Sequence, residues 1–285
     1  MTKGIICFAF NNPQIDYVKQ AIFLAKRSKQ FLRLPVTLIT SDTDYINKAY
    51  KDQVKVFDKI IPLKKSKDVT WKRYYNGPFH WNSLPFNNKH RSMAYDLSPY
   101  DQTILLDTDY IINSKQLLKC FSSKEKLMFN RNAVDLAGWR NIKEFKYIND
   151  SGIDFYWATA VYFKKSKKAN LFFNTLQHIE ENYDHYAMTY NVGTSTFRND
   201  HAFSIAVHML NGFQSGDFVK ELPTKMYYTL DRDVPIKIQD NKIELMIEKK
   251  GYHGQYTCLT VKDLDVHIMN KYELNDTINK ALLNE

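Results

Sequence analysis

Two aspartates one residue apart, Asp107 and Asp109, have the types and spacing that most directly suggest chemistry. They follow an apolar run at residues 103–106 that lacks polar alternation, which is typical of a strand buried on both faces. Carboxylates at positions i and i+2 of an extended backbone point the same way. Unpaired at the edge of a core they would repel each other and resist desolvation, and a divalent cation removes both problems. The alternative is a polar strand end whose acids are solvated or cap the next turn.

A histidine near the end of the chain is a second candidate. His267 stands in the short apolar segment 266–269, and Lys271 follows it four residues later. A lone histidine in an apolar run is often a core residue, and it can also be a metal ligand. The residues alone leave both interpretations open.

The elements in front of the two aspartates alternate between strand and helix. Apolar runs of strand length occupy residues 4–10, 35–40 and 54–61, with a helix capped by Asp16 after the first and a short helix after the second. This order predicts a parallel sheet with right-handed crossovers, and therefore an α/β fold with a mostly parallel central sheet flanked by helices. Ligands of such sheets bind at the carboxyl ends of the strands. The polar residues expected at that edge are Asn11, Asn12, Ser41, Asp42 and residues 107–109.

The second half of the chain continues with mixed elements. A helix at 88–97 carries Lys89 and Arg91, and further helices are expected at 114–121, 169–182 and 200–210, with strands at 126–130 and 155–163. Asp200 is either the N-cap of its helix or a residue facing the cleft, because helix N-termini line such clefts. The last third predicts a smaller β subregion, with strands at 226–230, 236–238 and 243–247 and a short, nearly neutral tail.

Residues 64–88 interleave aromatic and basic side chains. The prolines in this segment argue against a helix, so we expect a long loop at the sheet edge. Its rings and cations could stack on an acceptor and hold phosphates, or the loop could fold its aromatic side chains onto the body of the protein. The residues concerned are Trp71, Arg73, Tyr74, Tyr75 and Trp81.

Composition limits the function classes. The 285-residue chain has a formal net charge of +9, which favours anionic partners, although solvated lysines could also produce it. Three widely separated cysteines indicate a reducing compartment and no zinc site. The glycine patterns of dinucleotide-binding folds and of P-loops do not occur. Without a signal-peptide pattern or an apolar stretch of about 20 residues, we expect a cytoplasmic protein with no stable membrane insertion.

The order of these elements resembles the nucleotide-sugar-binding half of GT-A glycosyltransferases, with a lysine-bearing helix before the strand that ends in Asp107-Thr108-Asp109. His267 with Lys271 resembles the segment of the glycogenin-like retaining transferases, glycosyltransferase family 8, in which a histidine completes the metal site. That segment has the pattern H-x-x-G-x-x-K-P-W, and this chain lacks its glycine and its Pro-Trp. The resemblance implies a single GT-A-like domain over residues 1–285, with a nucleotide-sugar-binding half at 1–113 and an acceptor-side half at 114–285.

The same resemblance implies roles for individual residues. Asp107, Asp109 and His267 would hold Mn²⁺ or Mg²⁺, and a mixture of carboxylate and imidazole suits Mn²⁺ better than Ca²⁺. Lys271 would neutralise the departing diphosphate. The other residues expected to bind the nucleotide sugar are Phe8, Asn11, Asp42, Lys89, Arg91 and Thr108. Asp154 and Asp200 are the candidates facing the donor sugar and the acceptor hydroxyl.

These expectations combine into a metal-dependent glycosyltransferase that uses a nucleotide sugar, most simply a UDP-sugar, with retention if the likeness to family 8 holds. The acceptor is either a glycan or lipid-linked saccharide, or a hydroxymethylated DNA base of the kind that some phages modify. The charge and the aromatic segment favour DNA, in which case the enzyme would act in the host cytoplasm. The alternatives are a non-catalytic nucleic-acid-binding module and a nucleotidyltransferase or phosphohydrolase, which should bring carboxylates for a second metal.

Overall fold

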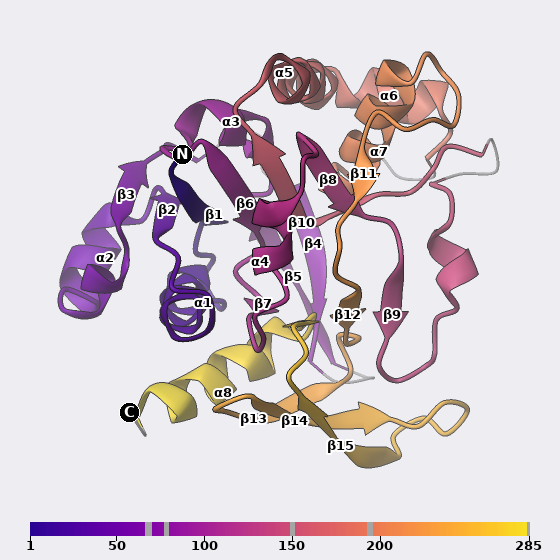
Figure 1. Cartoon of the computed structure of the whole chain (residues 1–285). Coiled ribbons are helices and arrows are strands. Elements are labelled where there is room, and N and C mark those ends of the chain that lie inside the picture. The colour runs from indigo at the N-terminus through magenta and orange to yellow at the C-terminus, as the bar shows by residue number, and fades with distance from the viewer. Residues whose placement is uncertain (66–69, 77–79, 149–151, 193–195, 284–285) are drawn as a thin grey trace.

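A seven-stranded sheet forms the centre of the molecule (Figure 1). The computed structural model describes residues 1–65, 70–76, 80–148, 152–192 and 196–283. The strand order is β11-β8-β10-β6-β1-β2-β3, and β10 runs antiparallel to both of its neighbours while the other pairs are parallel. This confirms the mostly parallel α/β sheet. The strands are β1 Lys3–Ala9, β2 Val36–Thr40, β3 Lys59–Pro62, β6 Gln102–Leu106, β8 Leu127–Asn130, β10 Trp157–Lys164 and β11 Lys220–Glu221.

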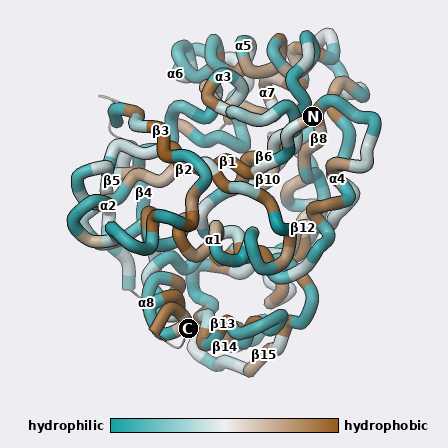
Figure 2. Tube along the Cα trace, turned by 60° about the vertical axis from the view of Figure 1, so that its left-hand side comes forward, coloured by the Kyte–Doolittle hydropathy of each residue, from teal (hydrophilic) through white to brown (hydrophobic). Residues whose placement is uncertain are grey.

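Helices cover both faces of this sheet, as the alternation of side chains in β1 requires. Ile5 and Cys7 belong to the hydrophobic cluster that includes the apolar stripe of α1. Ile6 belongs to the cluster formed with α5 and α7 on the opposite face. In Figure 2 the hydrophobic colour is concentrated in these central strands. The helices are α1 Tyr17–Phe31, α2 Thr43–Ala49, α3 Ala94–Leu97, α4 Leu118–Ser122, α5 Lys167–Glu181, α6 Tyr183–Thr189, α7 Asn199–Leu210 and α8 Lys271–Leu283, and the 3-10 turns are η1 Gln53–Val56, η2 Arg91–Met93 and η3 Ile142–Phe145.

Three expected elements differ in the structure. The expected strand at 54–61 is partly wrong, because residues 53–56 form η1 and pack Val54 and Val56 on the core from a turn. The expected helix at 88–97 begins only at η2, because His90 has φ 85° and its left-handed backbone interrupts a helix. The expected helix at 114–121 is shorter and begins at Leu118.

Three smaller sheets surround the central one. The four-stranded sheet has the order β7-β16-β12-β9 and the three-stranded sheet has the order β13-β14-β15, while β4 and β5 form a hairpin. These sheets confirm a smaller β subregion. Their strands are β4 Thr70–Tyr75, β5 Trp81–Phe86, β7 Tyr110–Ile111, β9 Ala133–Asp135, β12 Met226–Tyr228, β13 Val234–Gln239, β14 Lys242–Glu248, β15 Tyr256–Lys262 and β16 Val266–His267.

The C-terminal helix α8 packs on β13 and against α1 (Figure 1). Neither α8 nor β15 was expected from the sequence. The signal for α8 was present, because Leu274 and Ile278 are buried four residues apart on one helical face, with Ala281 and Leu282 beside them. In the described part of the chain no helix has the length and apolar character needed to cross a membrane.

Candidate functional site

The Asp107-Thr108-Asp109 segment forms a turn between β6 and the short strand β7. The backbone of Asp107 is held on both sides: its N–H donates to the Thr159 carbonyl at 3.0 Å, and its own carbonyl accepts the N–H of Tyr110 at 3.1 Å. β7 pairs with β16, with His267 opposite Tyr110. The N–H of Ile268 then donates to the carbonyl of Asp109 at 3.0 Å. This pairing brings His267 to the end of the central strand.

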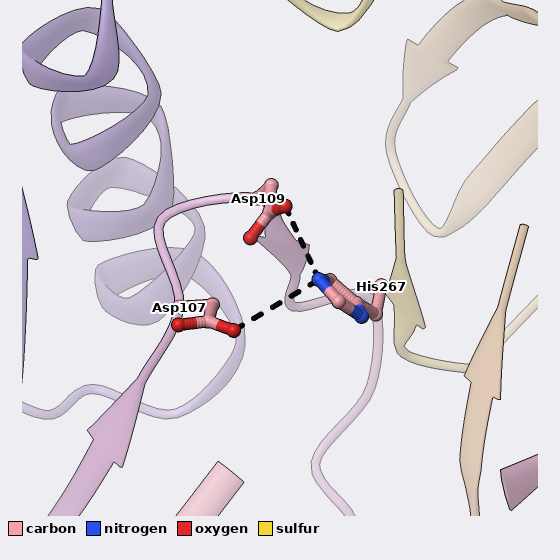
Figure 3. Close-up of side chains that lie close together, drawn as sticks. All are labelled: Asp107, Asp109 and His267. Carbon is pink, nitrogen blue, oxygen red and sulfur yellow. Dashed lines mark hydrogen bonds and ion pairs between the residues drawn. The ribbon is translucent and has the colours of Figure 1, made fainter. Parts of the chain in front are cut away.

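Asp107, Asp109 and His267 face one another (Figure 3). The Nε2 atom of His267 lies 3.1 Å from Asp109 Oδ2 and 3.9 Å from Asp107 Oδ2. One ligand atom from each residue falls within 4.8 Å of the others. Around an octahedral ion with metal–ligand distances of about 2.1 Å, neighbouring ligands lie about 3 Å apart and opposite ligands about 4 Å apart. The three residues therefore fit a divalent cation, although His267 is also buried as a core residue would be.

Each carboxylate of the pair has a cationic partner. The Nζ atom of Lys271 lies 2.5 Å from Asp109 Oδ2, and the guanidinium of Arg91 pairs with Asp107 and donates to the Ala158 carbonyl at 2.6 Å. Burial acts to raise the pKa of Asp109, but Lys271 and His267 outweigh it and hold that pKa well below its usual range. Asp109 is therefore an anion at neutral pH.

These residues border a cavity of about 630 Å³, which we call the site cavity. That volume lies within the ordinary range for a small-molecule site. Its lining combines cations, carboxylates and aromatic rings. The basic members are Lys72, Arg73, Lys89, Arg91, Arg140, Arg198 and Lys271, the acidic members are Asp107, Asp109, Asp200 and Asp231, and the tryptophans are Trp71 and Trp157. The excess of positive charge suits an anionic ligand.

Four buried polar atoms of the lining residues have no hydrogen-bond partner among the described residues: Asn88 Oδ1, Asn199 Oδ1, Trp157 Nε1 and His267 Nδ1. The amide nitrogens of the asparagines are engaged, because Asn88 donates to the Phe197 carbonyl at 2.9 Å and Asn199 donates to the Asn88 carbonyl at 2.8 Å. The two asparagine oxygens and the indole N–H therefore have no hydrogen-bond partner among the described residues. Asn88, Asn199 and Trp157 were not among the expected site residues; Asn88 adjoins Lys89 and Asn199 adjoins Asp200 in the sequence, whereas Trp157 adjoins neither.

The structure separates the two carboxylates expected at the donor sugar. Asp200 lines the site cavity, and its Oδ1 accepts the N–H of Ala158 at 2.8 Å. The N-cap interpretation of Asp200 is wrong, because α7 begins one residue earlier and Arg198 is its N-cap. Asp154 is absent from the cavity lining and pairs with Arg131 at 2.7 Å.

Among the residues expected to bind the nucleotide sugar at the ends of the first two strands, Phe8 lines the site cavity, and Asn11 and Asp42 do not. The N–H of Asn11 donates to Asp42 Oδ2 at 2.7 Å, so the ends of the first two strands do meet. The side chain of Asn11 accepts the N–H of Val18 at 3.0 Å and is occupied at the start of α1. Thr108 is buried, and its hydroxyl donates to Gln20 of α1 at 3.1 Å.

The loop that carries Lys89 and Arg91 is clamped from α5. Both cations line the site cavity, and His90 lies between them in the left-handed conformation. Glu180 accepts the backbone N–H of His90 at 2.7 Å and the hydroxyl of Ser92 at 3.0 Å. The carboxylate holds a strained backbone at the point where two cations enter the cavity. The sequence offered no signal for Glu180.

The aromatic segment is a hairpin and not the expected loop, although its residues 66–69 and 77–79 lie outside the described chain. The interpretation that its aromatic side chains fold onto the body holds for part of them. Tyr74 is buried with its hydroxyl 2.9 Å from that of Tyr17, whereas Trp71 is 60% exposed and Trp81 is 47% exposed. Trp71 and Arg73 line the site cavity, and Tyr75 and Trp81 do not.

Lys72, between Trp71 and Arg73, also lines the cavity and was not among the expected residues. Burial lowers the pKa of its ammonium group to about 8, and the nearby Lys271 and Arg198 act in the same direction. Lys72 therefore loses its charge closer to neutral pH than an ordinary lysine does.

No protein-family model and no curated protein sequence matches this chain. Among solved structures, the chain is similar to the glycosyltransferase GlyE of Streptococcus pneumoniae, with 14% identity, a TM-score of 0.41 and coverage of 78% of this chain and 46% of that one. It is also similar to the galactosyltransferase LgtC in complex with donor and acceptor sugar analogues, with 11% identity, a TM-score of 0.42 and coverage of 72% and 70%. A third similar structure is 4-diphosphocytidyl-2C-methyl-D-erythritol synthase from Anaerococcus prevotii, with 13% identity, a TM-score of 0.37 and coverage of 79% and 86%. The chain spans about half the length of GlyE.

Proposed function

We propose that this protein is a metal-dependent glycosyltransferase of GT-A type that moves a sugar from a nucleotide sugar, most simply a UDP-sugar, to an acceptor hydroxyl. The observation that carries the proposal is the convergence of Asp107, Asp109 and His267 at the carboxyl end of β6, beside a basic cavity. A cation there would bind the donor diphosphate, and Mn²⁺ or Mg²⁺ suits the ligand set.

The residues around the site suit the charges of glycosyl transfer. Cleavage of the sugar–phosphate bond builds negative charge on the departing nucleoside diphosphate and positive charge on the sugar. A bound divalent cation acts as a Lewis acid on the diphosphate. Lys271 and Lys89 add positive charge to that side of the cavity, and Asp200 provides a carboxylate for the sugar. Retention of configuration follows if the likeness to family 8 holds.

The division into two functional halves is part of the proposal. Residues 1–113 would bind the nucleotide and supply the two aspartates, and residues 114–285 would supply Asp200, His267 and the acceptor side. The acceptor is a DNA base hydroxyl, with a glycan or a lipid-linked saccharide as the alternative.

A two-metal nucleotidyltransferase or phosphohydrolase is the second enzyme class to consider. Such sites hold two ions about 4 Å apart and need further carboxylates. Among the described residues, the structure provides one cluster of three metal-ligating side chains. This favours a single cation and glycosyl transfer.

Donor hydrolysis by the purified protein tests the proposal. UDP-, GDP- and CMP-sugars are incubated with the enzyme with and without Mn²⁺, and release of nucleoside diphosphate or monophosphate is measured. We expect cation-dependent hydrolysis of one donor class, and a loss of at least about 100-fold in Asp107→Ala and Asp109→Ala. Asp217→Ala removes an exposed carboxylate that pairs with Lys220 and serves as the control. Wild-type rates in both site variants would contradict the proposal, as would release of pyrophosphate in place of sugar.

A further inference from the structure

One face of the β4–β5 hairpin is a surface of aromatic rings with one cation. Side chains alternate along a strand, so every second residue lies on this face. The register places Trp71 opposite Pro85, Arg73 opposite Ser83 and Tyr75 opposite Trp81. The hairpin face is defined here as Trp71, Arg73, Tyr75 and Trp81.

The two tryptophans of the hairpin face have no role in the core. Trp71 is 60% exposed and Trp81 is 47% exposed, whereas Trp157 is buried against Phe155 and Tyr228. Large aromatic side chains that remain in water beside a cavity are typical of binding surfaces. The opposite side of the hairpin holds it on the body through Tyr74 and Leu84, which are both buried.

Arg73 adds a phosphate-binding group to the aromatic rings of this face. Its guanidinium carbon lies 4.7 Å from the centroid of the Trp81 ring. A guanidinium stacked in this way keeps its N–H groups directed outward, and its planar fork matches a phosphate. The combination of rings and arginine suits a strand of unpaired nucleotides.

The hairpin face is continuous with the site cavity, because Trp71 and Arg73 belong to both. The cavity lining contains seven lysines and arginines and four aspartates. A UDP-sugar carries about two negative charges and a divalent cation carries two positive charges. Their charges cancel, so binding both leaves the excess of positive over negative side chains in the lining unchanged. Three positive charges thus remain for an acceptor, and the chain as a whole has a net charge of +9. A neutral saccharide would leave these charges uncompensated.

We propose that the hairpin face binds single-stranded or locally unpaired nucleic acid, with bases stacked on Trp71 and Trp81 and a phosphate on Arg73, and that it delivers a base hydroxyl to the site cavity. This inference rests on the proposed function. The hydroxyl oxygen forms the new bond to the anomeric carbon of the sugar. The bond from that carbon to the diphosphate oxygen breaks, the diphosphate leaves with the electron pair, and it takes up the hydroxyl proton. A base in a duplex would have to leave the stack to reach the cavity.

Fluorescence anisotropy with a short single-stranded oligodeoxynucleotide tests the inference, with cytosine and hydroxymethylcytosine versions of the probe. We expect binding that weakens steeply between about 50 and 200 mM salt. Trp81→Ala should weaken binding at least about tenfold, and Trp81→Phe should restore most of it, because the stacking surface is kept. Arg73→Gln should reduce the salt slope by about 0.7, the value for one phosphate contact on a single strand. Phe213→Ala removes an aromatic ring that is 64% exposed elsewhere and should bind as wild type does.

Thermal unfolding of each variant shows that it is folded before its binding is compared. Donor hydrolysis by the wild-type protein without an oligonucleotide reports on the proposed function separately. Hydrolysis without oligonucleotide binding would overturn the inference and leave the proposed function standing. Salt-independent binding of a neutral oligosaccharide that Trp81→Ala abolishes would also overturn it, in favour of a saccharide acceptor. If the protein neither hydrolyses a donor nor binds the oligonucleotide, both fail.

Discussion

Replacing Lys271 with methionine should make the stability of this protein depend on a divalent cation. The Nζ atom of Lys271 lies 2.5 Å from Asp109 Oδ2, and the two side chains are only 8% and 5% exposed. Removing one partner of a buried ion pair costs about 3–5 kcal/mol, because the other charge is left without compensation. In the variant Asp109 still has His267 at 3.1 Å. We therefore expect a loss at the lower end of that range, about 3 kcal/mol of unfolding free energy.

A divalent cation should recover much of this loss, because it supplies the charge that Lys271 provided. A ligand present at about 100 times its Kd stabilises the native state by about 2.7 kcal/mol. The wild-type protein should gain less from the cation, since Lys271 already compensates Asp109. The difference between the two gains measures how strongly the lysine and the cation share one carboxylate.

Urea unfolding in EDTA and in excess Mn²⁺ provides the assay. The variants are Lys271→Met and, as a matched control, Lys119→Met on the exposed side of α4. The control should unfold as wild type does in both conditions. The reasoning is refuted if Lys271→Met loses the same free energy with and without Mn²⁺, or if the control loses as much.

Three further predictions follow from other parts of the molecule. Phe129→Ala removes a buried ring whose centroid lies 5.0 Å from that of Phe172, so it should lower the free energy of unfolding in urea by about 3–5 kcal/mol. Leu171→Ala, at a position that is 50% exposed, should change that free energy by less than about 0.5 kcal/mol. Glu180→Ala leaves the N–H of His90 without its acceptor, so it should lower the unfolding free energy by about 1–3 kcal/mol and raise the KM for the donor, and Glu180→Gln should do less of both. The pKa of Lys72 is lowered to about 8, so its positive charge disappears as pH rises through 8. Donor binding by the wild type, measured by titration, should therefore weaken above that pH. Donor binding by Lys72→Arg should not change there, because arginine keeps its charge.

Local pattern was sufficient for the central sheet and for the position of the two aspartates. The fully buried strands β2 and β6 read as continuous apolar runs, and α1 reads as an amphipathic helix that begins at Asp16. These features depend on neighbouring residues, so they are visible in the sequence. The hairpin was mistaken for a loop because its polar and aromatic alternation was attributed to a binding segment and not to the period of a strand.

The membership of the site was decided by pairings between distant parts of the chain. Strands β7 and β16 have two residues each, too few for a periodic signal, yet their pairing brings His267 to Asp109 across 158 positions. Asp154 and Asp200 looked equivalent in the sequence, and only the packing of α7 on β10 brings Asp200 to the cavity.

A strand that ends in two carboxylates is visible in the residue order, and carboxylates at the edge of a core need compensating partners. The groups that compensate them become known only from the folded arrangement. Arg91 begins η2 and Lys271 begins α8, which are far apart in the sequence, and both side chains reach the same turn. Electrostatic partners are set by distance in space, and distance in space depends on how complete elements pack, which no local pattern of residues encodes.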